Sequence, residues 1–228
     1  AKDFGVAVFD NASDAVAGAA LWLLAVNPQV MRHVCNDLSA VAKSSKPLVV
    51  SIAAGITATQ LQRWLGGDAS IIRAMPNTPA LLGAGVTGLY ANAHVSAAGR
   101  TDAEGLLASA GKTVWIGDEA LMDSVTAVSG SGPAYVFLLA EAMEAAAKAE
   151  GLDDGAARTL VLQTILGAAR MLTESDEAPA ELRERVTSPN GTTQAAIEAF
   201  QHGGFEALVA GAIAAASERG RQLSAAND

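Results

Sequence analysis

The sequence is poor in several features that mark whole classes of protein. Aromatic residues make up 4% of the 228 residues, cysteine occurs once, as Cys35, and basic residues form no run. A lone cysteine excludes a disulfide framework and is typical of a reducing compartment, so we expect a cytoplasmic protein. The net charge of −9 argues against nucleic acid as the main partner.

Long apolar runs and clusters of metal ligands are missing as well. The apolar stretches are interrupted well short of a bilayer span, so we expect no transmembrane helix, and no signal peptide is visible. We expect the three scattered histidines to be surface or packing residues without carboxylate or cysteine partners at ligand spacing; they are His33, His94 and His202. A metal site is therefore not expected.

What the sequence has in plenty is aliphatic residues, and in the first half they alternate between strand and helix patterns. Because each strand is followed by a helix after a short link, this half is predicted to form a doubly wound parallel α/β domain over residues 1–117. Asn11 and Thr57 are expected to cap helices. The predicted strands are 6–9, 21–26, 47–52, 70–75, 85–90 and 113–116, and the predicted helices are 12–16, 29–42, 58–65 and 96–110.

From Asp118 onward the strand signals stop, and residues 118–228 are predicted to form an all-α domain. In the helix expected over 153–173, Leu162, Ile165, Leu166 and Ala169 follow the i, i+3, i+4, i+7 spacing of one apolar stripe. Such a domain can be a self-contained bundle or half of an intertwined dimer. We favour the dimer because the apolar stripes are broad and the polar faces thin. The other helices are expected at 118–128, 132–150, 179–186, 192–201 and 204–224.

Three strand ends in the first half carry unusual small and polar residues, namely 25–28 (AVNP), 51–55 (SIAAG) and 75–79 (MPNTP). Ligands of open α/β sheets sit beyond the carboxyl ends of the strands. Small residues there let a flat ring or a phosphate approach the backbone, and Asn77 and Thr78 add uncharged polar groups. Each segment alone is ordinary turn chemistry, but the three together favour a nucleotide crevice.

Two loops in the helical half are rich in Gly, Ser, Thr and Pro, at 129–135 (SGSGPAY) and 187–193 (TSPNGTT). The second runs straight into a helix, where unpaired N–H groups and the positive end of the helix dipole favour a carboxylate or a phosphate. Capping alone explains either loop. The occurrence of both in one chain favours a site for a small anion.

Five strings together resemble the pyrroline-5-carboxylate reductase family, in order and at its spacing: LAVNPQ at 24–29, SIAAGIT at 51–57, IRAMPNTPALLGAG at 72–85, AVSGSGPAYVF at 127–137 and RVTSPNGTT at 185–193. The resemblance implies reduction of 1-pyrroline-5-carboxylate to L-proline with NADPH or NADH. It implies a Rossmann domain followed by an α-helical dimerisation domain. Homodimers that assemble into larger rings such as decamers are also implied.

The resemblance also implies roles for individual residues. The substrate carboxylate and ring nitrogen would be held by Gly191, Thr192 and Thr193, with the Thr193 hydroxyl at the ring nitrogen, and Asp176 would lie near the substrate. Asn77, at the third strand end, is assigned to the cofactor. The residues that would line the dinucleotide are Asn11, Ala25, Val26, Asn27, Pro28 and Ala54.

The sequence departs from the family pattern in three places. The Gly-rich GxGxxG loop and its first βαβ segment lie upstream of the residues present, so we expect an N-terminally truncated Rossmann domain. Asn27 stands where the family has Lys, which is expected to weaken binding of an NADP phosphate. Asn190 replaces a more usual Gly, a mild change because Asn tolerates left-handed backbone angles.

Two other functions are open to such a chain. One is a β-hydroxyacid-type dehydrogenase with a lysine acid/base, but Lys112 precedes a predicted strand and Lys148 lies on an Ala-rich helical face. The other is an oligomerising remnant without catalysis, which the missing Gly-rich loop favours.

Overall fold

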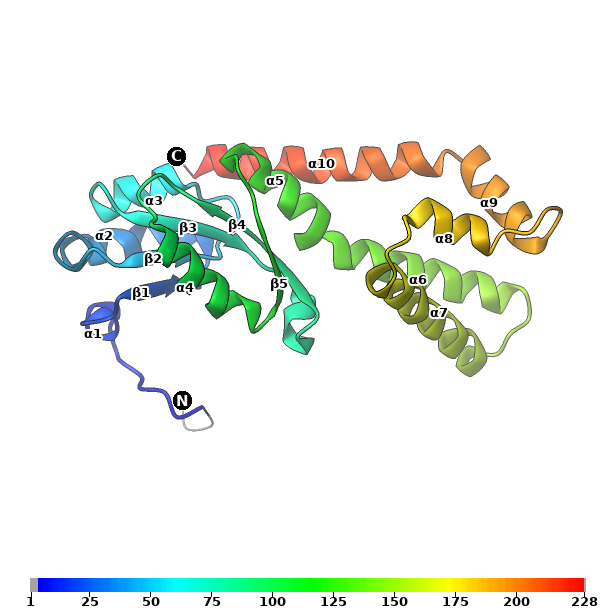
Figure 1. The fold of residues 1–228 in the computed structure, drawn as a ribbon, viewed down its shortest axis with the longest axis horizontal. Coiled ribbons are helices and arrows are strands. Elements are labelled where there is room, and N and C mark those ends of the chain that lie inside the picture. Colours follow the sequence, from blue (N-terminus) through cyan, green and yellow to red (C-terminus); the bar gives the residue numbers. More distant parts are fainter. Residues whose placement is uncertain (1–3, 228) are drawn as a thin grey trace. The chain divides into compact units, whose positions relative to one another are not determined.

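The structure, a computed structural model, describes residues 4–227. Its described residues form two compact units, of which the first runs to Pro133 and resumes at Ile213, and the second is Ala134–Ala212. The strands and the helices that cover them all belong to the first unit (Figure 1). The predicted domain boundary between 117 and 118 coincides with the change from strands to helices, and as a domain boundary it stays a prediction.

The first unit is built on a five-stranded sheet in the order β1-β2-β3-β4-β5. Most predicted elements are present, and α3 and β3 have the predicted bounds. The strands are β1 (Leu21–Leu24), β2 (Leu48–Ser51), β3 (Ser70–Met75), β4 (Gly85–Ala91) and β5 (Gly111–Trp115), and the helices among them are α1 (Ala12–Val16), α2 (Pro28–Ser45), α3 (Ala58–Leu65), the 3-10 turn η1 (Thr78–Leu82) and α4 (Ala97–Ala108).

The sheet is mixed, which corrects the prediction that all its strands are parallel. Strands β1, β2 and β3 are parallel to one another, β4 is antiparallel to β3, and β5 is parallel to β4. The reason is the short link of residues 76–84 between β3 and β4, which contains only η1. A parallel crossover needs roughly a dozen residues or more, so β4 turns back beside β3.

The strand predicted over 6–9 was wrong, because residues 6–9 have no regular structure. Val6, Val8 and Phe9 are all exposed, Val8 by 71%. A short apolar segment becomes a strand only when a neighbouring strand completes its hydrogen bonds, and within the described residues no sheet pairing involves this segment.

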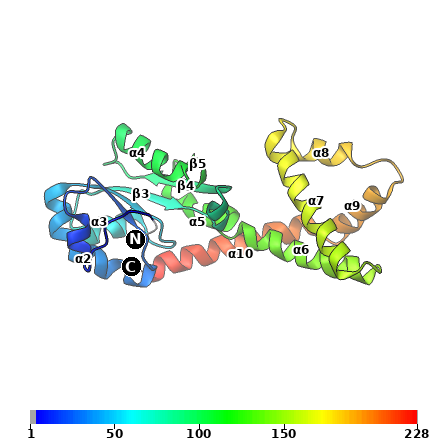
Figure 2. The same ribbon diagram turned by 90° about the horizontal axis from the view of Figure 1, so that it is seen from below.

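The two faces of the sheet are covered by different helices (Figure 2). Side chains of adjacent strand residues point to opposite faces, so Val49 and Ile71 pack in one cluster with Met31 and Leu38 of α2 and with α3 residues. Their neighbours Val50 and Ile72 join Ala103 and Leu107 of α4 in a second cluster. The α/β unit therefore has two apolar layers, one on each side of the sheet.

After β5 the chain is helical, as predicted. The segment expected as one helix over 118–128 is divided into η2 (Glu119–Leu121), α5 (Met122–Val125) and the π-helical turn η3 (Thr126–Gly130). The helices that follow are α6 (Gly132–Ala149), α7 (Asp154–Glu174), the short α8 (Pro179–Arg185), α9 (Thr192–His202) and α10 (Phe205–Ala226). Across residues 4–227, none of the helices is long and apolar enough to cross a membrane.

The helical unit buries few of its apolar side chains within one chain. Among its described residues the buried hydrophobic ones are Ala157, Val161 and Leu182. By contrast, Phe137 of α6 is 66% exposed, and Leu162 and Leu166 of the predicted α7 stripe are exposed as well. A single copy thus leaves apolar helix faces uncovered, which is typical of a unit completed by another chain.

Candidate functional site

The three decorated strand ends lie at one edge of the sheet. Strands β1, β2 and β3 are consecutive neighbours and run parallel, so their carboxyl ends face the same way. The segments 25–28, 52–57 and 76–79 therefore line one edge, where ligands of open α/β sheets bind. This is the arrangement that the sequence predicted for a nucleotide crevice.

The segment after β1 ends in the N-terminus of α2. Asn27 is the N-cap, since its Oδ1 accepts a hydrogen bond from the Gln29 backbone N at 3.3 Å, and Pro28 is the first helical residue. Ala25 and Asn27 are exposed, whereas Val26 and Pro28 are half-buried. A long helix that begins at this edge presents its positive dipole end there. Its first donors are already used, since Pro28 has no N–H and the N–H groups of Gln29 and Val30 donate to Asn27.

Asn11 is likewise a helix cap. Its Oδ1 accepts a hydrogen bond from the Asp14 backbone N at 2.9 Å, and its Nδ2 donates to Asp14 Oδ2 at 2.7 Å. The predicted cap of α1 is therefore confirmed, whereas a contact of Asn11 with a dinucleotide stays a prediction.

Asn77 joins two motifs that look independent in the sequence. Its Nδ2 donates to Ser129 O at 3.1 Å, and its Oδ1 accepts from the Val86 backbone N at 3.0 Å. A Cβ added to Gly130 would lie 2.7 Å from Met75 Cε. The MPNTP segment therefore packs against the SGSG segment, and the Asn77 amide already has two backbone partners. Its assignment to the cofactor stays a prediction.

The turn after β2 carries Ala54 and leads into α3. Gly55 has a φ of +70°, a left-handed angle that favours glycine. Thr57 and Gln60 form a capping box, in which Thr57 Oγ1 accepts from Gln60 N at 3.1 Å and Gln60 Oε1 accepts from Thr57 N at 2.8 Å. The cap predicted at Thr57 is thereby confirmed.

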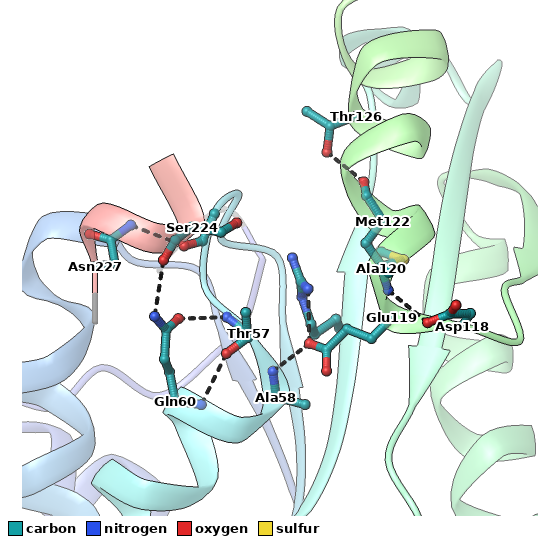
Figure 3. Close-up of polar contacts among 12 residues, drawn as sticks. Thr57, Ala58, Gln60, Asp118, Glu119, Ala120, Met122, Thr126, Ser224 and Asn227 are labelled. Atoms are coloured by element: carbon teal, nitrogen blue, oxygen red, sulfur yellow. Dashed lines mark hydrogen bonds and ion pairs between the residues drawn. The ribbon is translucent and has the colours of Figure 1, made fainter. Parts of the chain in front are cut away.

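A carboxylate from far along the chain also reaches the start of α3 (Figure 3). Glu119 Oε1 accepts a hydrogen bond from the Ala58 backbone N at 2.6 Å and pairs with Nη1 of the buried Arg73 at 2.9 Å. Sequence reasoning missed the role of both residues. Glu119 lies in no recognisable motif, Arg73 is only one letter of the string at 72–85, and the two are 46 positions apart.

The 187–193 loop and α9 belong to the helical unit. Asn190 has a φ of +58°, which confirms that it occupies a left-handed position, and its N–H donates to Gln194 Oε1 at 2.7 Å. Gly191 is the N-cap of α9, and Thr192 and Thr193 are the first two helical residues. Such residues carry N–H groups without an intrahelical acceptor.

Two details limit what Gly191 can do. Its N–H donates to Ser188 O at 3.0 Å, so that donor is used within the loop. A Cβ at position 191 would lie 2.5 Å from Ser188 Oγ and 3.0 Å from the Ser188 carbonyl oxygen, so a larger residue would require the loop to adjust. Asp176 is exposed in the connection between α7 and α8, and nothing in its surroundings tests the assignment to the substrate.

The predicted residues thus fall into two groups. Those assigned to the cofactor belong to the α/β unit, and those assigned to the substrate belong to the helical unit. Within residues 4–227, no three His, Cys, Asp or Glu side chains gather as metal ligands. One expectation about the histidines was wrong, since His33 Nε2 lies 3.4 Å from Asp37 Oδ2 on an exposed face of α2.

Comparison with known proteins gives consistent matches. The family model described as pyrroline-5-carboxylate reductase dimerisation matches residues 119–223, and one described as NADP oxidoreductase coenzyme F420-dependent matches residues 1–55. The chain is 53% identical to a pyrroline-5-carboxylate reductase of Pseudomonas aeruginosa over 98% of its own length and 82% of the relative's. It is 46% identical to the Haemophilus influenzae protein of the same name, over 96% and 80%.

Solved structures agree. A pyrroline-5-carboxylate reductase from Coxiella burnetii superposes with a TM-score of 0.94 at 39% identity, covering 98% of this chain and 83% of that one. A pyrroline carboxylate reductase from Plasmodium falciparum, solved with NADP bound, has a TM-score of 0.82 at 32% identity and covers 90% and 77%.

Proposed function

The chain belongs to the pyrroline-5-carboxylate reductase family, and we infer that it reduces 1-pyrroline-5-carboxylate to L-proline, the last step of proline biosynthesis. The observation that carries this is 53% identity over nearly the whole chain to a curated relative of that name. The resemblance predicted from the five strings is confirmed. The alternative, a β-hydroxyacid-type dehydrogenase, would use a lysine as acid/base. Lys148 forms an exposed ion pair with Asp154 at 2.9 Å and Lys112 lies within β5, so neither of these lysines supports it.

The edge formed by the strand ends fits a nicotinamide dinucleotide, which supplies the hydride when bound. Small residues at Ala25 and Ala54 let a ring approach the backbone, and the N-terminus of α2 offers a positive dipole end to a phosphate. Asn11, Val26, Asn27, Pro28 and Asn77 complete the proposed lining. NADPH or NADH is the cofactor, as the NADP oxidoreductase model and the NADP-bound relative support. Weaker phosphate binding through Asn27 stays a prediction.

The N-terminus of α9 is the proposed binding site of the substrate carboxylate. Thr192 and Thr193 offer the first N–H groups of the helix, where the dipole favours an anion. Because the Gly191 N–H is held by Ser188 O, Gly191 contributes by allowing the tight turn. Asp176 is proposed to lie near the substrate.

The chemistry asks little of these residues beyond orientation. A protonated ring imine is already electrophilic at carbon, so a hydride adds there and the electron pair of the C=N bond moves to nitrogen, giving the amine. The Thr193 hydroxyl accepts a hydrogen bond from the iminium N–H and can donate to the product amine. No strong acid is required, which suits a site without a positioned His or Lys.

The helical unit also serves assembly. Its family model is a dimerisation domain, and the exposed apolar faces of α6 and α7 provide the surface that a second chain would cover. We propose that such dimers build a decamer and that the protein works in the cytoplasm. The buried, unpaired Cys35 suits a reducing compartment.

An assay of the protein with pyrroline-5-carboxylate and each reduced nicotinamide tests the function. We expect substrate-dependent loss of nicotinamide absorbance and formation of proline. Titration of NADPH fluorescence and the intact mass separate enzyme from remnant: a protein of 23.0 kDa that binds no nicotinamide would overturn the proposal.

A further inference from the structure

The C-terminal end of α10 packs directly on the turn after β2. A Cβ built on Gly55 would lie 3.3 Å from Leu223 Cβ and 3.6 Å from Asn227 Nδ2. Leu223 and Asn227 are four positions apart and therefore lie on one face of the helix end. Because Gly55 has no side chain, the backbone of the turn lies directly against this face of α10.

Side chains of the α/β unit and of α10 join this contact with hydrogen bonds (Figure 3). Asn227 Nδ2 donates to Gly55 O at 3.0 Å and to Leu223 O at 2.9 Å. Gln60 Nε2 donates to Ser224 O at 3.1 Å, and Arg32 Nη2 donates to Asn227 O at 3.0 Å. The last carbonyls of a helix lack intrahelical partners, so these donors complete the helix end.

The turn after β2 and the start of α3, residues 53–58, are also bonded to residues other than those of α10. Gln60, which binds Ser224, completes the capping box with Thr57, and Glu119 binds the Ala58 N–H. Glu119 opens the helical half of the chain and Asn227 lies near its end. The segment 53–58 is therefore held by both stretches of chain through which the α/β unit continues into the helices.

We propose that Asn227 is a positioning residue for the cofactor, acting through the Gly55 carbonyl on the turn that carries Ala54. The inference rests on the proposed function, in which Ala54 lines the dinucleotide. A turn with a left-handed glycine has backbone freedom that the flanking strand does not fix. The bond from Asn227 restricts that freedom and holds the turn ready for the cofactor, which lowers the cost of binding.

The test compares Asn227→Ala and Asn227→Leu, the second of which keeps the branched shape but cannot donate. Gln222→Ala is the matched control, because Gln222 is an exposed amide on the same helix, bonded within α10 to Glu218. The readouts are the Kd of NADPH from fluorescence titration, kcat, the KM values for both substrates, and the melting temperature without cofactor.

We expect both Asn227 variants to raise the Kd and KM for NADPH by about tenfold, the size of one lost hydrogen bond, with kcat and the KM for pyrroline-5-carboxylate nearly unchanged. The Gln222 control should match the unmodified protein. Two results would overturn the positioning role alone. One is an NADPH affinity in both Asn227 variants equal to that of the unmodified protein. The other is a loss of NADPH affinity, kcat and pyrroline-5-carboxylate affinity together, with a lower melting temperature. Failure of the unmodified protein to bind NADPH would overturn the proposed function with it.

Discussion

Glu119 Oε1 lies 2.9 Å from Arg73 Nη1 and 2.6 Å from the backbone nitrogen of Ala58, so one carboxylate oxygen joins β3, α3 and the first helical turn after the sheet. The Arg73 side chain is 9% exposed and that of Glu119 22%. A guanidinium this buried depends on its partner, because removing that partner leaves an uncompensated charge. Glu119 therefore stabilises the junction between the sheet and the helical half.

Replacing Glu119 with Ala should destabilise the α/β unit by about 3 kcal/mol, since Arg73 is then buried without its carboxylate. Urea unfolding followed by tryptophan fluorescence measures this directly, because Trp22, Trp64 and Trp115 all lie in that unit. The double variant Arg73→Met with Glu119→Leu is the control and should recover much of the loss. A Glu119→Ala protein as stable as the unmodified one would contradict this role.

Asn190 should tolerate Gly but not Ala. Its φ of +58° costs a β-carbon-bearing residue about 1 kcal/mol more than glycine, and the strain would fall on the loop that leads into α9. Asn190→Ala should raise the KM for pyrroline-5-carboxylate and lower the melting temperature, while Asn190→Gly leaves both close to their original values. Steady-state kinetics and thermal unfolding check this, and identical Ala and Gly variants would speak against it.

Loss of the Thr193 hydroxyl should lower kcat/KM by about one to two orders of magnitude. A charge-assisted hydrogen bond contributes about 1.5–3 kcal/mol, and the loss converts to that range of rate. Thr193→Val keeps the shape without the hydroxyl, whereas Thr193→Ser keeps the hydroxyl and should retain most activity. An unchanged kcat/KM in the Val variant would remove the hydroxyl from the mechanism.

Cys35 should make the protein less stable in alkali. Burial raises the pKa of the Cys35 thiol from 9.0 to about 12. The folded-state pKa lies above the unfolded one. The contribution of the protonated thiol to the free energy of unfolding is therefore complete below pH 9 and is lost as the pH rises from 9 toward 12. The loss is about 1.4 kcal/mol per pH unit in that window.

The measurement for Cys35 is the free energy of unfolding between pH 8 and about pH 10.5. Above pH 9, the free energy of unfolding should decrease more steeply with pH for the unmodified protein than for Cys35→Ala, whatever their difference at pH 8. Parallel curves would show that the thiol does not titrate on unfolding. The native thiol should also resist alkylation at pH 8.

Leu166 should be required for assembly. It is 53% exposed in the α7 stripe, a surface that a second chain would cover. Leu166→Glu places a charge in that interface and should lower the sedimentation coefficient. Gln163→Glu adds the same charge to an exposed polar position on α7 and should not change assembly. Equal sedimentation of both variants would place the interface elsewhere.

Local signals account for what the sequence predicted well. Thr57 and Gln60 stand at capping-box spacing, and α3 and β3 have the predicted bounds. The strand over 6–9 was wrong because a short apolar pattern supplies no pairing partner, and the direction of β4 was wrong because the link before it is too short for a crossover. The contacts of Glu119 with Ala58 and of Asn227 with Gly55 span 61 and 172 positions, and no local pattern encodes them.

The most direct test of the account is a crystal structure of the protein with L-proline and NADP⁺. We predict the proline carboxylate within hydrogen-bond distance of the Thr192 and Thr193 backbone nitrogens, with the ring nitrogen at the Thr193 hydroxyl. Proline bound elsewhere, with the N-terminus of α9 buried and unoccupied, would contradict it.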